Sequence, residues 1–205
     1  LLSKTVEGSD VNRINAANGQ TVTVDAETWQ ILKRAKEISD LTGHAFSVTI
    51  APLTAMWDFT GGTERMPTEA QRLAALPLVD DDRLVLGDGN TVTLPSGMEI
   101  DLGGIAKGYA SDRVESVFRA GGVESGTISL GGNVFVLGSK PDGSAWRVGI
   151  KDPQNESGLA VILPLQDAYA ITSGGYERYF EENGKTYHHI IDPATGYPAD
   201  SGLLS

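Results

Sequence analysis

The stretch with the clearest capacity for chemistry is residues 99–112, EIDLGGIAKGYASD. The apolar residues Met98, Ile100 and Leu102 predict a short strand, and the glycine pair after them predicts a turn into a helix that ends at Gly121. A strand, a glycine turn and a helix N-terminus point unpaired backbone N–H groups at one place, where an anion can bind. Gly104 lets a ligand approach the main chain closely because it has no Cβ.

Lys107 lies in the first turn of this predicted helix, where the helix dipole disfavours a cation. A bound anion would explain its position. The alternative is a strand–helix corner with a solvated lysine, and in that case Asp101 simply caps the helix. The residues alone leave both interpretations open.

Composition limits the classes of function. The 205 residues carry a formal net charge of −11, which argues against nucleic acid or an anionic membrane as the main partner. The absence of cysteine excludes disulfides, thiolate metal sites and a cysteine nucleophile. No apolar run approaches the roughly 20 residues of a membrane span, and no signal peptide is visible. Because the chain begins with Leu1, we expect that an N-terminal segment has been removed.

Two helices and one irregular segment are predicted in the first half of the chain. Asp25 is expected to cap a helix that closes at Gly43, and Pro67 to open a short helix through residue 76. The apolar segment 45–57 contains Pro52, so it is expected to be a buried irregular segment. The apolar face of the first helix is predicted to comprise Trp29, Leu32, Ala35 and Ile38.

Strands dominate the second half of the prediction. Segments 83–86 and 91–94 flank the turn GDGN, a strong hairpin signal, and segments 159–165 and 168–172 are expected to form another hairpin. Further strands are predicted at 127–130, 133–137, 146–150 and 186–191. Strands in succession with inserted helices predict an α+β fold with largely antiparallel or mixed sheets. No repeat or linker is visible, so residues 1–205 are expected to form a single domain.

Seven stretches in one order carry a family resemblance. They are SDVNRIN (9–15), AFSVTIAPLTAMWDF (45–59), DLGGIAKGYASD (101–112), SLGGNVFVLG (129–138), WRVGIKDP (146–153), TSGGYERYF (172–180) and HHIIDPATGYP (188–198). In these stretches the chain resembles the ApbE-type FAD:protein FMN transferases, once called thiamine biosynthesis lipoproteins. The resemblance implies an ApbE-like, T-fold-like architecture of sheets with packed helices.

The resemblance also implies an activity. Enzymes of this family bind FAD as substrate together with Mg²⁺ and transfer the FMN phosphoryl group to a threonine hydroxyl of a target flavoprotein, releasing AMP. The target is typically a subunit of a membrane redox complex. In phosphoryl transfer of this kind, positioning and charge neutralisation provide most of the catalysis.

Particular residues match the family's functional positions. The main-chain carbonyl of Gly104 matches a metal ligand. Lys107 and His189 match the catalytic positions, Lys107 facing the diphosphate and His189 taking part in proton transfer or phosphate binding. The flavin-nucleotide contacts are expected from Ala45, Phe46, Ser47, Asp101, Lys107, His189 and Ile191. We expect these segments to line one cleft, although relatives often carry Asp where this chain has Ser47.

Structural alternatives stand beside these assignments. His188 and His189 are predicted on one strand, so they should face opposite sides, and at least one is expected to be a structural histidine. Phe46, Trp57 and Phe59 are expected in the core rather than stacked on a flavin. The dipeptides Asp152-Pro153 and Asp192-Pro193 are typical of turns.

The chain departs from the family pattern at both ends. Relatives begin with a lipoprotein signal and an early FAD-binding strand, and they continue with an Asp-Ala-x-x-Thr type motif that completes the metal site. Without that motif, we expect residues 1–205 to bind flavin weakly and to lack Mg²⁺-dependent transfer. By resemblance, the full-length protein is expected to be extracytoplasmic or periplasmic, with a lipid anchor upstream of Leu1 that associates it with the membrane.

Two further functions stay open at this point. An FAD pyrophosphatase, which splits FAD into FMN and AMP, would need the same diphosphate site. A flavin-binding module without catalysis would need only the nucleotide contacts.

Overall fold

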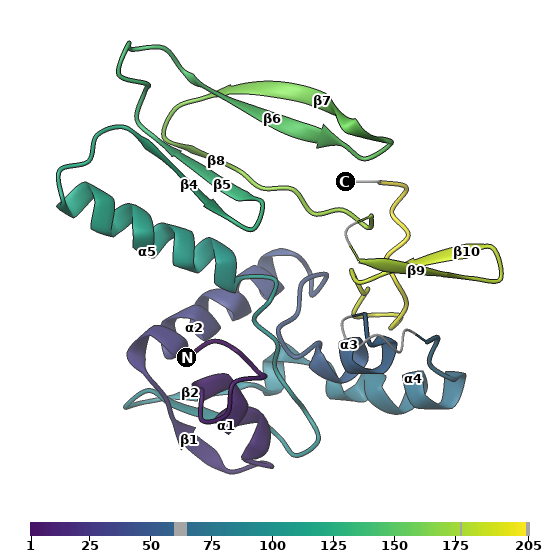
Figure 1. Cartoon of the computed structure of the whole chain (residues 1–205). Helices are drawn as coiled ribbons and strands as arrows, with labels where there is room; N and C mark the ends of the chain where they lie inside the picture. The colour runs from purple at the N-terminus through teal and green to yellow at the C-terminus, as the bar shows by residue number, and fades with distance from the viewer. Residues whose placement is uncertain (60–64, 177, 204–205) are drawn as a thin grey trace. The chain divides into compact units, whose positions relative to one another are not determined.

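The computed structural model describes residues 1–59, 65–176 and 178–203 (Figure 1). The helices are α1 (Asp10–Ala16), α2 (Ala26–Leu41), α3 (Ala51–Trp57), α4 (Glu69–Ala75) and α5 (Ala106–Ala120), with short 3₁₀ helices η1 (Leu76–Leu78) and η2 (Asp81–Arg83). The strands are β1 (Thr21–Thr23), β2 (Val85–Gly87), β3 (Thr91–Thr93), β4 (Gly126–Leu130), β5 (Asn133–Leu137), β6 (Trp146–Asp152), β7 (Asn155–Leu165), β8 (Ala168–Ala170), β9 (Tyr179–Glu182) and β10 (Lys185–His188). All the pairings between these strands are antiparallel, which confirms the α+β class.

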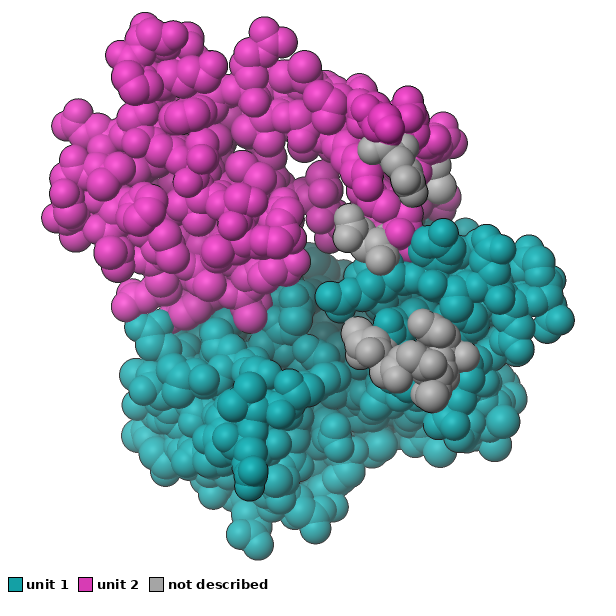
Figure 2. Space-filling model, viewed as in Figure 1, with its two compact units in different colours: residues 1–105, 177–201 teal, residues 106–176, 202–205 magenta. Residues whose placement is uncertain are grey.

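The chain divides into two compact units (Figure 2). Unit 1 comprises Leu1–Ile105 and Glu177–Ser201, and unit 2 comprises Ala106–Tyr176 and Gly202–Ser205. The expected single domain over residues 1–205 stays a prediction.

Unit 1 contains a three-stranded sheet in the order β1-β3-β2. The predicted hairpin is confirmed, because Val85 of β2 lies opposite Thr93 of β3 and the turn between them has positive φ at Gly89 and Asn90. Helix α2 begins at its predicted cap, where the Asp25 carboxylate accepts a hydrogen bond from the Glu27 N–H. The buried residues of α2 are Thr28, Ile31, Leu32, Ala35 and Ser39, of which Leu32 and Ala35 belong to the predicted face.

A second cluster in unit 1 surrounds Trp57 at the end of α3. Its buried members are Leu53, Trp57, Ala75, Tyr187 and Ile191. The prediction of an irregular segment at 45–57 was wrong for its second half. Pro52 lies in the first helical turn, where its missing N–H would have no intrahelical partner, so it starts α3 instead of breaking it.

Two predicted strands in unit 1 differ from the prediction: one does not form and the other is shorter. Residues 98–102 do not form a strand, although Met98, Ile100 and Leu102 are buried alternately. Their backbone groups are bonded to the Asn15 side chain and to the Val48 carbonyl instead of to a neighbouring strand. Strand β10 ends at His188, and Ile191 instead forms an isolated bridge with Pro198. Helix α4 also begins later than predicted, since Thr68 rather than Pro67 starts it as the cap of a capping box.

Unit 2 combines helix α5 with a sheet in the order β4-β5-β8 and a separate β6–β7 hairpin (Figure 1). Val114 and Phe118 of α5 pack on a cluster of Ile128, Phe135 and Leu137. The predicted hairpin of 159–165 with 168–172 was wrong, because β7 pairs with β6 and β8 pairs with β5.

Asp167, the residue that precedes β8, is bonded to α5 and to the residue after β5. Its carboxylate accepts hydrogen bonds from the Gly138 N–H and from Arg119. These contacts hold the residue that precedes β8 beside the end of β5.

Candidate functional site

In unit 1, the segment 45–48 and the glycine turn 101–104 lie side by side. The Asp101 N–H donates to the Val48 carbonyl at 2.8 Å. The ring of Phe46 lies against Gly104, where an added Cβ would be 3.1 Å from the Phe46 Cε2 atom. Position 104 therefore favours glycine because of this close approach, and the fold joins two motifs that are far apart in the sequence.

Asp101 is held by two partners within unit 1. One carboxylate oxygen accepts from the Gly103 N–H at 2.8 Å, and the other lies 2.7 Å from the Lys4 ammonium nitrogen. The carboxylate thus caps the glycine turn rather than helix α5, which begins only at Ala106. A nucleotide contact at Asp101 would include Lys4, which the sequence analysis did not select.

Asn15, in the first motif, clamps the approach to this turn. Its side-chain oxygen accepts from the Ile100 N–H at 2.8 Å, and its side-chain nitrogen donates to the Ile100 carbonyl at 3.0 Å. Ser9 of the same motif is the N-cap of α1, which carries Asn15. The SDVNRIN motif contributed to the family resemblance, but its spacing did not indicate that Asn15 would bond to Ile100.

Ser47 is engaged by a buried carboxylate that sequence reasoning missed. The Ser47 hydroxyl donates to Asp81 at 2.8 Å, and Asp81 also accepts from the backbone N–H groups of Val48 and Thr49. Asp81 is buried, whereas Asp82 beside it is exposed. Nothing in the run of three aspartates indicates which one turns inward.

In unit 2, Lys107 lies in the first turn of α5, as predicted. It is exposed, and its ammonium group donates to the Gly131 carbonyl at 3.3 Å. Gly131 and Gly132 both have positive φ and form the tight turn from β4 to β5. The Lys107 cation in the first turn of α5 and the Gly131–Gly132 turn thus meet within unit 2, an arrangement that can bind an anion.

Tyr169 fixes the middle of α5 in the same unit. Burial raises the pKa of its phenol well above the ordinary value, and the hydrogen bond to Asp112 raises that pKa further. The phenol therefore stays protonated at neutral pH and donates to the Asp112 carboxylate. This bond ties the last residue of the DLGGIAKGYASD motif to β8.

The two histidines of unit 1 have different partners. His188 is bonded through both ring nitrogens to backbone, Nε2 to the Ala199 carbonyl and Nδ1 to the Ile190 N–H, so it is a structural histidine as anticipated. His189 is half-buried, and its Nδ1 lies 3.3 Å from the Arg178 carbonyl. A carbonyl only accepts, so in the neutral ring Nδ1 carries the proton and Nε2 the lone pair.

The other predicted contacts are of two kinds. Ala45 is exposed and Phe46 is half-buried, whereas the Ile191 side chain is buried against the Trp57 cluster. Trp57 and Phe59 pack in that cluster, as expected for core residues. The nucleotide roles of these residues stay predictions.

A magnesium ion at Gly104 would need side-chain ligands as well as a carbonyl. Among residues 1–59, 65–176 and 178–203, the only group of three or more carboxylates and imidazoles close enough to share an ion is Asp40, His44 and Asp82. That group does not include Asp101, whose oxygens bind Lys4 and the Gly103 N–H. Among the described residues, no group of three or more such side chains lies at Gly104.

No helix in the described parts of the chain is both long enough and apolar enough to cross a membrane.

Comparison with known proteins extends over the whole chain. The model of the ApbE family matches residues 1–205. A Klebsiella pneumoniae FAD:protein FMN transferase is 39% identical over 210 residues, which cover all of this chain and 64% of that protein. A Treponema pallidum FAD:protein FMN transferase is 33% identical over 222 residues, covering all of this chain and 61% of that protein.

Solved structures agree with these matches. The crystal structure of an ApbE protein from Thermotoga maritima superposes with a TM-score of 0.91 at 38% identity, over 97% of this chain and 65% of that one. The apo flavinyl transferase ApbE of Pseudomonas stutzeri gives 0.85 at 32% identity, over 97% and 63%. The chain thus spans slightly less than two thirds of the length of these relatives. The match of the family model over residues 1–205, together with the likeness in sequence and fold, shows that this chain belongs to the ApbE family.

Proposed function

We propose that this chain is the flavin-nucleotide-binding part of an FAD:protein FMN transferase. Membership of the ApbE family and the names of its relatives support this activity. The observation that carries the proposal is the contact of the 45–48 segment with the 101–104 turn, through Phe46 against Gly104 and Val48 bonded to Asp101. Two stretches assigned to the nucleotide by the family pattern are thereby adjacent.

The reaction is the displacement of AMP by an alcohol. The threonine hydroxyl oxygen bonds to the FMN-side phosphorus, the bond from that phosphorus to the bridging oxygen breaks, and AMP leaves with that oxygen. The hydroxyl proton must go to a base. We assign this role to His189, which the family pattern places at a catalytic position.

Lys107 serves the charge balance of the same reaction. The diphosphate of FAD is anionic and the chain carries a net charge of −11, so local positive charge is needed to bind it. The Lys107 ammonium supplies one charge, and the N-terminus of α5 supplies about half a charge. Because water screens each of these charges in an exposed site, neither acts alone, and we expect both to contribute to the affinity for FAD.

The remaining parts of the proposal come from the family resemblance alone. We propose that the whole protein uses Mg²⁺ with the Gly104 carbonyl as one ligand, which supplies charge neutralisation to the diphosphate when bound. We also propose a flavoprotein subunit of a membrane redox complex as acceptor. The same resemblance supports an extracytoplasmic location with a lipid anchor.

Product analysis on the whole protein tests the activity. FAD is incubated with Mg²⁺, with and without a threonine-bearing acceptor protein, and AMP, free FMN and acceptor-bound flavin are measured. A transferase gives AMP and covalent flavin in equal amounts. Equal AMP and free FMN whether or not the acceptor is present would indicate an FAD pyrophosphatase, and no AMP with FAD still bound would indicate a non-catalytic module.

A further inference from the structure

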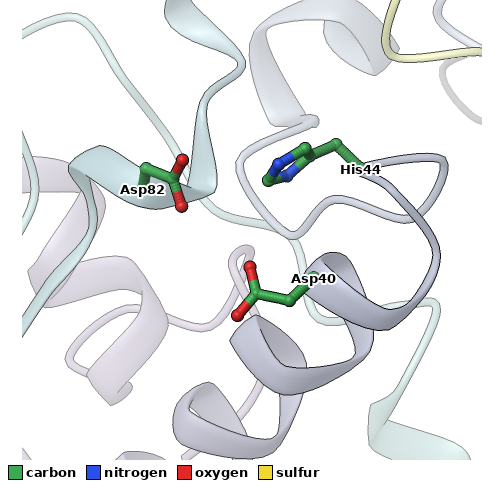
Figure 3. Close-up of side chains that lie close together, drawn as sticks. All are labelled: Asp40, His44 and Asp82. Carbon is green, nitrogen blue, oxygen red and sulfur yellow. The ribbon is translucent and has the colours of Figure 1, made fainter.

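Three side chains of unit 1 converge on one point of the surface (Figure 3). Asp40 lies in the last turn of α2, His44 in the loop that follows it, and Asp82 in η2. One ring nitrogen of His44 and one carboxylate oxygen from each aspartate lie within 4.8 Å of one another. All three residues are exposed, so an ion could reach them from solvent.

The imidazole is oriented by a residue outside the group. The hydroxyl of Ser39, a residue that is only 1% exposed, lies 3.2 Å from His44 Nδ1. The backbone N–H of His44 also donates to the Ser39 carbonyl at 2.8 Å, and this bond holds the loop in place. With Nδ1 engaged, Nε2 is the nitrogen left for a metal, and metal-binding histidines are commonly fixed in this way through the other ring nitrogen.

The surrounding charge favours a cation. Asp80 and Asp81 precede Asp82, and the Asp80 carboxylate accepts the Asp82 N–H at 3.0 Å. Two basic side chains also lie close by in the chain or in space, and both are directed to main-chain carbonyls, Lys36 to that of Asp81 and Arg83 to that of Pro77. The two facing carboxylates of Asp40 and Asp82 repel each other, so a bound cation would remove an unfavourable interaction.

We propose that Asp40, His44 and Asp82 bind a divalent transition-metal ion of the zinc type, at a site different from the magnesium position assigned to Gly104. Two carboxylate oxygens and one imidazole nitrogen suit Zn²⁺, and the nitrogen ligand disfavours Mg²⁺. Water completes the coordination because the site is open. The ion links the end of α2 to η2, and η2 carries the Asp81 that holds residues 47–49.

Calorimetric titration of the 205-residue chain with Zn²⁺ tests the site. We expect one ion per chain, with affinity lowered at least about tenfold by Asp82→Asn and by His44→Asn. Asparagine is chosen at position 44 because it tolerates the φ of +64° found there. Asp88→Asn, at an exposed aspartate in the β2–β3 turn, is the matched control and should leave the affinity unchanged.

The position of the ion is checked by NMR of the histidine ring nitrogens. The chain has three histidines, and Zn²⁺ should shift the signals of His44 and leave those of His188 and His189 in place. Ser39→Ala should weaken binding by about tenfold or more, since it frees the ring, with circular dichroism confirming that α2 is intact. Absence of stoichiometric binding, shifts at the other histidines, or equal affinity in the parent, Asp82→Asn and His44→Asn chains would each overturn the proposal.

Discussion

The two units bury very different amounts of apolar side chain. Unit 2 buries a small set: Ile128, Phe135, Val136, Leu137 and Ala170. Unit 1 buries a much larger set: Val11, Ile14, Val24, Ile31, Leu32, Ala35, Val48, Ala51, Leu53, Trp57, Ala75, Leu84, Val92, Leu94, Met98, Ile100, Leu102, Tyr187 and Ile191.

This difference indicates how each unit holds its candidate site residues. In unit 1 the 45–48 and 101–104 segments are each anchored by a buried side chain, Val48 in the first and Leu102 in the second. In unit 2, Lys107 lies on a helix whose only buried residue is Ser111. That helix is held by the partly buried Val114 and Phe118 together with polar contacts such as Tyr169 to Asp112. Packing should therefore dominate the response to mutation in unit 1, and polar contacts should matter more in unit 2.

The largest effect is expected from Trp57→Ala in unit 1. Trp57 is completely buried, packs against Phe59 and Tyr187, and donates its indole N–H to the Gly196 carbonyl. Its removal should lower the free energy of unfolding by about 3–5 kcal/mol, measured by urea denaturation. Val117→Ala in unit 2, at a side chain that is 69% exposed, is the control and should change it by less than about 0.5 kcal/mol. Similar losses in the two variants would remove the contrast between the units.

A smaller loss is expected from Asn15→Ala, which tests the polar part of unit 1. The change leaves the Ile100 N–H and carbonyl without their amide partner, and it should lower the free energy of unfolding by about 1–3 kcal/mol. Gln20→Ala, at an exposed amide, is the comparison and should be close to neutral. If Asn15→Ala were equally neutral, the approach to the glycine turn would be held by packing alone.

The smallest effect concerns Asp167 in unit 2. Its hydrogen bond from the Gly138 N–H, followed by that from Arg119, lowers the pKa of this carboxyl below the ordinary value of 3.8. The carboxylate therefore contributes stability that is present above pH 3.8 and is lost as the pH falls through the lowered pKa. The protection of the Gly138 amide against exchange, relative to the intrinsic rate at each pH, should fall in that acidic range.

The substitution Asp167→Asn should remove this pH dependence of Gly138 protection while leaving the Trp57 cluster of unit 1 unaffected. Because Asp167 is exposed to solvent, the effect should be confined to β5 and β8. An unchanged pH profile in the variant would mean that the Asp167 contact does not stabilise this edge of the sheet.

Local patterns were sufficient to predict several elements. Helix α2 was predicted from its Asp25 cap and helix α5 from its apolar spacing, and the turn GDGN predicted the β2–β3 hairpin. The glycine turn before Lys107 was found because its chemistry is local. These features depend on residues that are neighbours in the chain.

Features that depend on distant partners were missed. The pairing of β8 with β5 rather than with β7 joins segments that are far apart in the sequence. Pro52 had two valid interpretations until the helix around it was known. The burial of Asp81 and the Lys4–Asp101 ion pair also involve partners far away in the sequence. No spacing rule on the chain indicates such contacts.

The central claim is that Lys107 and the N-terminus of α5 bind the diphosphate of FAD. Its most direct test is equilibrium titration of the 205-residue chain with FAD, comparing the parent, Lys107→Ala and Lys33→Ala, a matched change at an exposed lysine on α2. Removal of one charge-assisted hydrogen bond to the diphosphate should weaken FAD binding by about tenfold or more. We predict this loss in Lys107→Ala and no loss in Lys33→Ala; equal FAD affinity in all three chains would contradict the claim.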